Sequence, residues 1–369
     1  MKLSTTTIRT FLSRIVGIAA AASVASLSLL SVTNVTAGAA QHPTLVVYSA
    51  QGYDSAVVKA FNVTHPGFNV TLNDNSTGPL LQQIQAEGNN PKWGVLWVDG
   101  ATAFAALDLK HMLVKDSVPH VSFNALGTAN IPADRSFTPA SITVVGALCY
   151  DSSQISANQL PSTWAQLANV KYQGALGMND PSQSGPTYPL IAGVMDYLGK
   201  YQKGPTGHAV SLGRTFFKGL YNNGMLVNAT NGPTIGAMQA HQIKMAIIQS
   251  SACYGSKLNG SFSTIKVKYL NFSIALPGVI GIDAKMPPAV QAEAKKFVAY
   301  VMSRAGQHVM QTGDPQGDSL FWPTINGENP ANPIIPSLAS THAITINPYV
   351  WGPLESQINS WFDGSIANG

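Results

Sequence analysis

Short apolar runs of strand length alternate along this chain with segments of helical periodicity, and this alternation limits the possible folds more than any other feature. The first strand-like run is TLVVYSA (44–50), and a helical segment separates it from FNVTLND (68–74). A second helix, ending at Gly88, leads to the buried run GVLWVDG (94–100) and then to a third helix. Strands that alternate with helices in this way predict an α/β layer with a mostly parallel sheet.

A second α/β set follows the first and is joined to it by two long strands. ITVVGALCYD (142–151) opens the second set, and NFSIALPGVIGID (271–283) closes it. The chain is also too long for one simple core, so we expect two lobes connected by a two-strand hinge. The predicted first lobe comprises residues 41–142 plus 272–345, and the predicted second lobe comprises residues 143–271 plus 346–369.

The N-terminal segment has the pattern of a secretory signal peptide. Lys2, Arg9 and Arg14 precede an apolar, Ala-rich run, which ends in the small residues Ala37-Gly38-Ala39. A basic region, an apolar region and a small-x-small site are typical of a cleaved export signal, which we place at residues 1–40. The alternative is a membrane anchor, but the apolar run is short for a span. We therefore expect an extracytoplasmic, periplasmic or otherwise secreted protein.

Charge and cysteine content restrict the partners and the compartment. Only 10% of the residues are charged and no basic run occurs, which argues against nucleic acid as a partner. After export, Cys149 and Cys253 can form one disulfide or remain as two buried thiols, and the sequence leaves both alternatives open. The eight histidines are scattered without metal-binding spacing, so we expect no metal and no cofactor.

Small polar residues follow the predicted strands, and three of these stretches have a common form. Thr77-Gly78-Pro79, Ser184-Gly185-Pro186 and Asn231-Gly232-Pro233 each place a small polar residue, Gly and Pro at a predicted helix start. Helix N-termini carry unpaired N–H groups and a partial positive charge, so three of them aimed into one cleft can bind an anion without Lys or Arg. The alternative is that the triplets only start helices.

Several of these stretches resemble a known family. LVVYSAQGYD, NSTGPLLQQIQAEGNNPKWGVLWVDG, NDPSQSGPTYPLIAGVMDYLG and KFVAYVMSRAGQHVM are similar to periplasmic substrate-binding proteins of bacterial ABC importers. The resemblance is to the branch that contains ferric-ion-binding and 2-aminoethylphosphonate-binding proteins. It implies a type II periplasmic-binding-protein fold with mixed, mostly parallel sheets, a monomer that captures a small anionic solute, and a membrane permease as partner.

The resemblance also implies which residues bind the solute, with an organophosphonate or organophosphate as the class and 2-aminoethylphosphonate as the favoured ligand. Asp99 would face the ammonium group. Helix starts and strand ends would hold the phosphonate and form the walls of the site. The expected set, besides Asp99, is Ser49, Gln51, Ser76, Thr77, Gly78, Ser184, Gly185, Thr187, Tyr188, Asn231, Gln249 and Ser250.

Two other functions stay open. The first is binding of ferric ion or of another small solute such as a polyamine or a thiamine-like molecule. Iron-binding members use two adjacent tyrosines, but this chain has Ser250-Ser251 there and its nearest tyrosine, Tyr254, comes late. The second is a secreted hydrolase. The chain has no G-x-S-x-G and no H-E-x-x-H motif, and no acid or base can be assigned to Ser184, so we expect a binding protein without catalytic residues.

Overall fold

The computed structural model describes residues 43–201 and 206–367, so the predicted signal peptide at residues 1–40 lies outside the described part. Its strands, in chain order, are β1 (Thr44–Ser49), β2 (Asn69–Asp74), β3 (Val95–Asp99), β4 (Phe137–Asp151), β5 (Leu176–Asn179), β6 (Leu226–Asn228), β7 (Met245–Gln249), β8 (Ile265–Lys268), β9 (Ser273–Ile282), β10 (Trp322–Pro323) and β11 (Ala343–Ile344). Its α-helices are α1 (Asp54–Thr64), α2 (Thr77–Glu87), α3 (Ala101–Asp108), α4 (Ala125–Ala129), α5 (Thr187–Tyr201), α6 (Thr206–Asn222), α7 (Asn231–Gln239), α8 (Ser250–Leu258), α9 (Pro288–Val301), α10 (Arg304–Gly313), α11 (Pro348–Trp351) and α12 (Glu355–Phe362).

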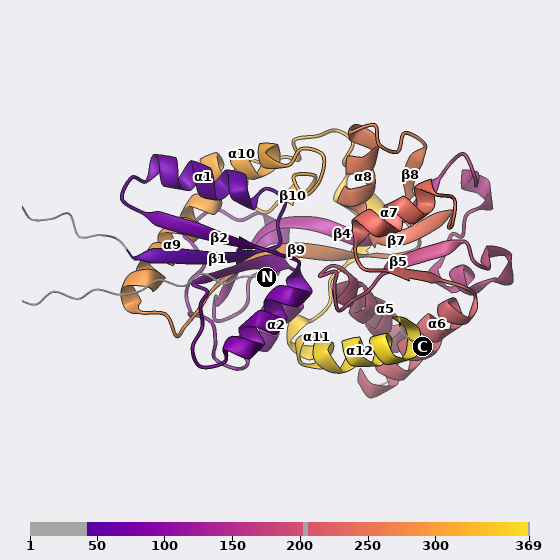
Figure 1. The fold of residues 1–369 in the computed structure, drawn as a ribbon, viewed down its shortest axis with the longest axis horizontal. Coiled ribbons are helices and arrows are strands. Elements are labelled where there is room, and N and C mark those ends of the chain that lie inside the picture. Colours follow the sequence, from indigo (N-terminus) through magenta and orange to yellow (C-terminus); the bar gives the residue numbers. More distant parts are fainter. Residues whose placement is uncertain (1–42, 202–205, 368–369) are drawn as a thin grey trace, which may run out of the picture. The chain divides into compact units, whose positions relative to one another are not determined.

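These strands form one mixed sheet with two parallel sets. The strand order is β2-β1-β3-β9-β4-β7-β5-β6. β1 runs parallel to β2 and β3, and β5 runs parallel to β6 and β7. Between the two sets lie β9 and β4, which are antiparallel to each other and to their outer neighbours (Figure 1). The alternation of strands and helices in the sequence therefore predicts the fold class correctly.

β4 and β9 connect the two parallel sets, and we call them the crossing strands. All 15 residues of β4 and all 10 residues of β9 are buried. The first part of β4 pairs with β9, and its last part, from Val145 on, pairs with β7. Such long, two-sided burial explains why both strands appear in the sequence as nearly continuous apolar runs.

Each parallel set has its own core. The first half, defined here as β1, β2 and β3 with α1, α2, α3, α9 and α10, is filled by large side chains that include Phe61, Trp97 and Phe297. The second half, defined as β5, β6 and β7 with α5, α6, α7, α8 and α12, is filled by others that include Phe217 and Phe272. Burial of such aromatic side chains supplies much of the free energy that stabilises each half.

The C-terminal segment touches both halves. β11 pairs with β9, and Tyr349 of α11 donates a hydrogen bond to Asp108 Oδ2 of α3 at 2.7 Å. Farther on, Ile358 and Phe362 of α12 are fully buried in the core of the second half, and α12 lies beside α5 and α6 in Figure 1. The sequence predicts this last helix at residues 354–362, and the structure confirms it.

Some boundaries differ from those that the sequence predicts. The sequence KMAIIQSS (244–251) predicts a strand that ends at Ser251, but β7 ends at Gln249 because Ser250 already begins α8. The sequence also predicts a helix near residues 161–167, but the structure has a 3₁₀ turn there, Trp164–Ala168. The short strands β6 and β8 are missed, since each offers too few residues to show a period of two. Across the described residues, every helix is too short or too polar to span a membrane.

Candidate functional site

The carboxyl ends of strands from both halves meet at the crossing strands. Asp99, the last residue of β3, lies opposite Gly278 of β9. Gln249, the last residue of β7, lies opposite Val145 of β4. Ligands of open α/β sheets bind outside the carboxyl ends of the strands, where the strand order changes. We therefore take the loops after β1, β3, β5, β6 and β7, together with the crossing strands, as the candidate site.

The first half contributes a hydrogen-bonded polar wall. Gln51 donates from Nε2 to Asp99 Oδ1 at 3.0 Å, and its Oε1 accepts from the Tyr53 hydroxyl at 2.6 Å. The same hydroxyl lies 3.2 Å from Ser141 Oγ on β4. Ser49 is fully buried, and its Oγ accepts from the Gln51 N–H at 3.2 Å. Ser49 and Gln51 thus orient Asp99 within the site, and Tyr53 is a member of this wall that the sequence analysis did not name.

A second carboxylate, Asp318, lies close to this wall. It comes from the loop after α10, and its Oδ2 accepts from the Gly52 N–H at 2.8 Å. Burial and the charge of Asp318 raise the pKa of Asp99 to about 7, although the hydrogen bond from Gln51 opposes the shift. Burial also raises the pKa of Asp318 to about 6, with the Gly52 N–H opposing the shift and the charge of Asp314 adding to it. Two crowded carboxylates of this kind favour a cationic partner.

The sequence pattern does not identify Asp318 as a site residue, because Asp318 does not follow any of the predicted strands. It lies in DPQGDS, a turn-forming stretch that carries no helical or strand period. Only the tertiary fold brings this turn to the loop after β1. A rule that looks for polar residues after predicted strands therefore cannot find it.

In the second half, Asn179 joins two of the three triplets. Its Nδ2 donates to Ser184 Oγ at 3.1 Å and to Asn231 Oδ1 at 2.7 Å, and its Oδ1 accepts from Thr234 Oγ1 at 2.7 Å. Asn179 ends β5, whereas Ser184 precedes α5 and Asn231 begins α7. The side chain of Asn179, also unnamed in the sequence analysis, thus holds two helix N-termini side by side.

The floor between the walls is formed by β4. Gln249, which is buried, donates from Nε2 to Thr143 Oγ1 at 3.1 Å. Thr143 and Ser141 are two residues apart on β4, so they face the same side of the sheet and lie roughly 7 Å apart. Ser141 contacts the first wall through Tyr53, and Thr143 contacts the second through Gln249, so the two walls reach neighbouring positions on the same face of β4. Ser250 and Thr187, the first residues of α8 and α5, are buried at the second wall.

Two of the triplets begin helices one residue earlier than a capping role for Thr77 and Asn231 predicts, and the helix after the third triplet, Ser184-Gly185-Pro186, begins later, at Thr187. Thr77 and Asn231 are the first helical residues of α2 and α7, so the N-cap residues are Ser76 and Thr230. Neither N-cap side chain makes a capping hydrogen bond. Ser184 lies a full turn before the first residue of α5 and accepts there from the Thr187 N–H through its carbonyl oxygen.

The three triplets lie together, and two of them touch across the halves. A Cβ placed on Gly185 would meet Thr77 Oγ1 at 2.3 Å, and one placed on Gly78 would meet the Ser182 carbonyl oxygen at 2.1 Å. These residues also border a groove of about 820 Å³ between α2, α3 and α12. Gly78 and Gly185 therefore pack against protein, whereas a Cβ on Gly232 of the third triplet would meet nothing within 4 Å.

Tyr188 does not join the site residues. Its side chain is fully buried in the core of the second half, and its hydroxyl donates to the Trp351 carbonyl oxygen. The helical period explains this position, since Tyr188 follows Thr187 by one residue and lies about 100° around the helix from it. The hydroxyl is used within the core, so we leave Tyr188 out of the proposed site.

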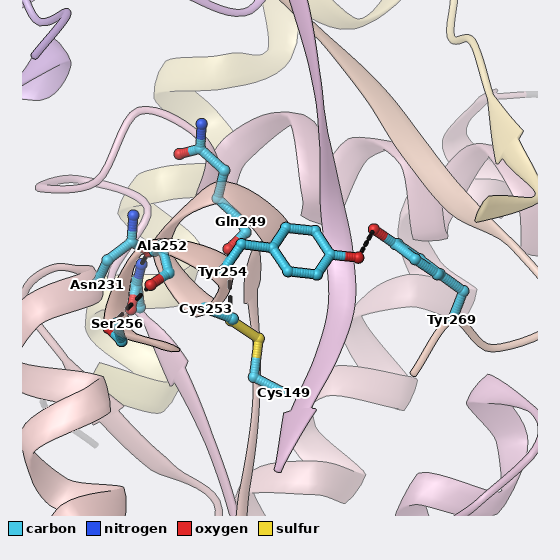
Figure 2. The surroundings of a disulfide bond; sticks show 9 residues. Cys149, Asn231, Gln249, Ala252, Cys253, Tyr254, Ser256 and Tyr269 are labelled. Atoms are coloured by element: carbon cyan, nitrogen blue, oxygen red, sulfur yellow. Dashed lines mark hydrogen bonds between the residues drawn. A yellow bond between two sulfur atoms is a disulfide. The ribbon is translucent and has the colours of Figure 1, made fainter. Parts of the chain in front are cut away.

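The two cysteines form a disulfide, which settles the alternative that the sequence leaves open. Cys149 of β4 is bonded to Cys253 of α8, with a Cα–Cα distance of 6.2 Å. Figure 2 shows that the bond lies in the turn of α8 that follows Gln249, with the Gln249 side chain directed away from it. On the neighbouring residue, the Tyr254 hydroxyl lies 3.0 Å from the Tyr269 hydroxyl. The disulfide thus attaches the start of α8 to the floor strand.

The charge of the site is unusual for one expected to hold an anion. The loops at the strand ends, residues 49–54, 99–102, 179–187, 228–232 and 249–252, contain no Lys or Arg. Among the residues that the structure describes, no three His, Cys, Asp or Glu side chains are arranged to hold a metal ion. The site therefore has carboxylates on the first wall, and hydroxyls, amides and helix N-termini on the second.

Two parallel α/β sets, joined by crossing strands and with their strand ends facing each other, define the class of type II periplasmic binding proteins. The comparison with known families agrees. Residues 56–317 match the family model described as bacterial extracellular solute-binding protein, and this match covers more than half of the chain. The chain belongs to this family, whose members are solute-binding components of ABC importers and are not enzymes.

Solved structures with the same fold carry different ligands. Iron-bound HitA from Pseudomonas aeruginosa is 18% identical, with a TM-score of 0.69 over 86% of this chain and 98% of that one. AfuA from Actinobacillus pleuropneumoniae, with fructose-6-phosphate bound, is 18% identical, with a TM-score of 0.73 over 88% and 99%. A periplasmic thiamin binding protein is 17% identical, with a TM-score of 0.67 over 89% and 98%. At these identities the similarity establishes the fold and leaves the ligand to be argued from the site.

Proposed function

We propose that this protein captures a small zwitterion with an anionic phosphonate or phosphate group and a cationic nitrogen, and delivers it to the membrane permease of an ABC importer. The favoured ligand is 2-aminoethylphosphonate. The observation that carries the proposal is the opposition of two chemistries across the crossing strands. Asp99 and Asp318 lie on one wall, and neutral donors with helix N-termini lie on the other.

The second wall can accept the anionic group without a formal cation. Helices α5, α7 and α8 begin at this wall, and the N-terminus of each helix carries unpaired N–H groups and a partial positive charge. Asn231, Ser184 and Ser250 add amide or hydroxyl groups to these N-termini. Hydrogen bonds to a charged group contribute about 1.5–3 kcal/mol each, so a few of them support micromolar binding.

The first wall explains why a simple anion fits less well than a zwitterion. The charges of Asp99 and Asp318 repel an anion placed near them, but they attract an ammonium group. An amine there would also compensate two carboxylates whose pKa values burial raises to about 7 and about 6. Because the two walls reach β4 at positions only two residues apart, one small molecule with its two charges a few bonds apart suits them.

Isothermal titration calorimetry with matched ligands tests this function. We expect 2-aminoethylphosphonate to bind more tightly than ethylphosphonate, which lacks the amine, and than propylamine, which lacks the phosphonate. Loss of one charge-assisted contact should raise Kd roughly 10- to 100-fold. Equal binding of ethylphosphonate would contradict the role of the carboxylate wall. Binding of ferric citrate or thiamine, without binding of any phosphonate, would replace the proposed ligand class.

A further inference from the structure

Three glycines lie where the two halves of the molecule touch, on both sides of the candidate site. Gly78 of α2 lies against the backbone of Ser182, and Gly185 lies against Thr77. On the other side, Gly255 of α8 lies against the loop after α10, where an added Cβ would meet the Gln316 carbonyl oxygen at 1.9 Å. Each contact joins an element of the first half to an element of the second half.

At two of these glycines the opposing atom belongs to the backbone. A methyl group on Gly78 would lie 2.1 Å from the Ser182 carbonyl oxygen and 2.9 Å from its carbon. On Gly255 it would lie 1.9 Å from the Gln316 oxygen and 2.7 Å from its carbon. Backbone atoms cannot rotate away as a side chain can, so either methyl would have to push the halves apart. At Gly185 the opposing atoms belong to the Thr77 side chain, which allows more adjustment.

Helix geometry alone does not explain these glycines. None of the three has a positive φ, so no backbone conformation reserved for glycine is needed there. Gly232 holds the same place in its triplet as Gly78, yet a methyl group there would meet nothing within 4 Å, and the same is true of Gly236 in α7. The difference lies in what faces each glycine, which is the other half at Gly78 and open space at Gly232.

We propose that Gly78, Gly185 and Gly255 are closure residues, which allow the two halves to come into contact around the solute and so bring the carboxylate wall and the helix-N-terminus wall to their facing positions. The inference rests on the proposed function in so far as the solute binds between the halves. It gives Gly78 and Gly185 a role that differs from the direct anion contact that the triplets suggest. These residues position the walls and do not touch the solute.

Alanine variants of these glycines, with a matched control, test the proposal. Gly78→Ala and Gly255→Ala should each weaken binding of 2-aminoethylphosphonate at least tenfold in calorimetry, and Gly185→Ala should weaken it less. Gly236→Ala, in a helix of the second half, should leave Kd unchanged. Small-angle X-ray scattering, measured with and without saturating ligand, should give a larger radius of gyration for Gly78→Ala and Gly255→Ala than for the Gly236→Ala control. Circular dichroism verifies that each variant is folded.

The outcomes separate this proposal from the proposed function. If the unmodified protein binds no phosphonate, the proposed function fails, and the scattering comparison of the ligand-free variants then decides whether these glycines control closure. If Gly78→Ala and Gly255→Ala match the control in radius of gyration and in Kd, the closure proposal is overturned even when 2-aminoethylphosphonate binds. If Gly185→Ala unfolds the protein, Gly78→Ala and Gly255→Ala still decide the question, because circular dichroism verifies the folding of each variant separately.

Discussion

At the scale of single residues, the chemistry of the site depends on a few side chains that join separate loops. Gln51 connects the loop after β1 to Asp99, and Asn179 connects the end of β5 to the first residue of α7. Asn and Gln suit this task because each can donate and accept at once. The sequence identifies the loops that these residues join, but not the joining itself, since hydrogen bonds between distant segments have no local pattern.

The Asp99→Asn variant should distinguish the contribution of the ligand's amine to affinity from that of its phosphonate. We expect Kd for 2-aminoethylphosphonate to rise roughly 10- to 100-fold, because a charge-assisted contact to the amine becomes a neutral one. Affinity for ethylphosphonate should stay the same or improve, because a repulsive carboxylate is removed. Calorimetry with both ligands measures the difference. Equal weakening for both would mean that Asp99 has no specific role toward the amine.

The Asn179→Asp variant should weaken binding of the ligand's phosphonate group at the second wall. A carboxylate between Ser184 and Asn231 would repel a phosphonate and add negative charge at two helix N-termini, so we expect loss of detectable phosphonate binding. Asn179→Ala, which removes the bridge without adding charge, is the matched control and should weaken binding less. Equal affinities of Asn179→Asp and the unmodified protein would contradict an anion site at this wall.

At the scale of elements, the sequence predicts the helices and long strands well and the helix starts less well. β4 and β9 are recognisable because their buried residues are continuous, and α12 because its apolar face has helical spacing. The end of β7 is predicted two residues too late because Ser250 and Ser251 are as compatible with a strand end as with a helix start. Tertiary contacts, including the disulfide at Cys253 near the start of α8, decide between the two.

The disulfide should stabilise the second half and the position of α8. It closes a loop across a sequence separation of 104 residues, and bonds that close such long loops contribute about 2–4 kcal/mol to the free energy of unfolding. We expect Cys149→Ser combined with Cys253→Ser to lower that free energy in urea titrations and to weaken solute binding through Gln249 and Ser250. Ser256→Ala, which changes α8 without touching the disulfide, is the control. An unchanged urea midpoint would show that packing alone holds α8.

At the scale of the whole molecule, buried carboxyl groups without basic partners set the pH dependence of stability. Burial raises the pKa of Asp54 to about 6 and that of Glu355 to about 7, in addition to the shifts at Asp99 and Asp318. For Asp151, by contrast, burial raises the pKa, but the hydrogen bonds from neighbouring side chains and backbone together outweigh it and lower the pKa to about 2. The raised pKa values mean that the folded chain binds more protons than the unfolded chain between about pH 4 and pH 7.

The ligand-free protein should therefore become more stable as the pH falls from 8 to 5. Stability changes with pH in proportion to the difference in bound protons, and here the folded state binds more, so the free energy of unfolding rises on acidification. Thermal unfolding at pH 8, 6.5 and 5 measures this as a rising midpoint. Affinity for 2-aminoethylphosphonate should change in the opposite direction, because protonated Asp99 and Asp318 no longer attract the amine. A midpoint that falls over this range would contradict the raised pKa values.

The covalent link between Cys149 and Cys253 also has a consequence for how the protein is made. In a reducing cytosol the two thiols would remain unbonded, and chains purified from there would lack the covalent link between β4 and α8. Export before folding, or expression in a strain with an oxidising interior, should yield a uniform preparation. For a chain of this kind, the route of biosynthesis is therefore part of what determines how well it binds.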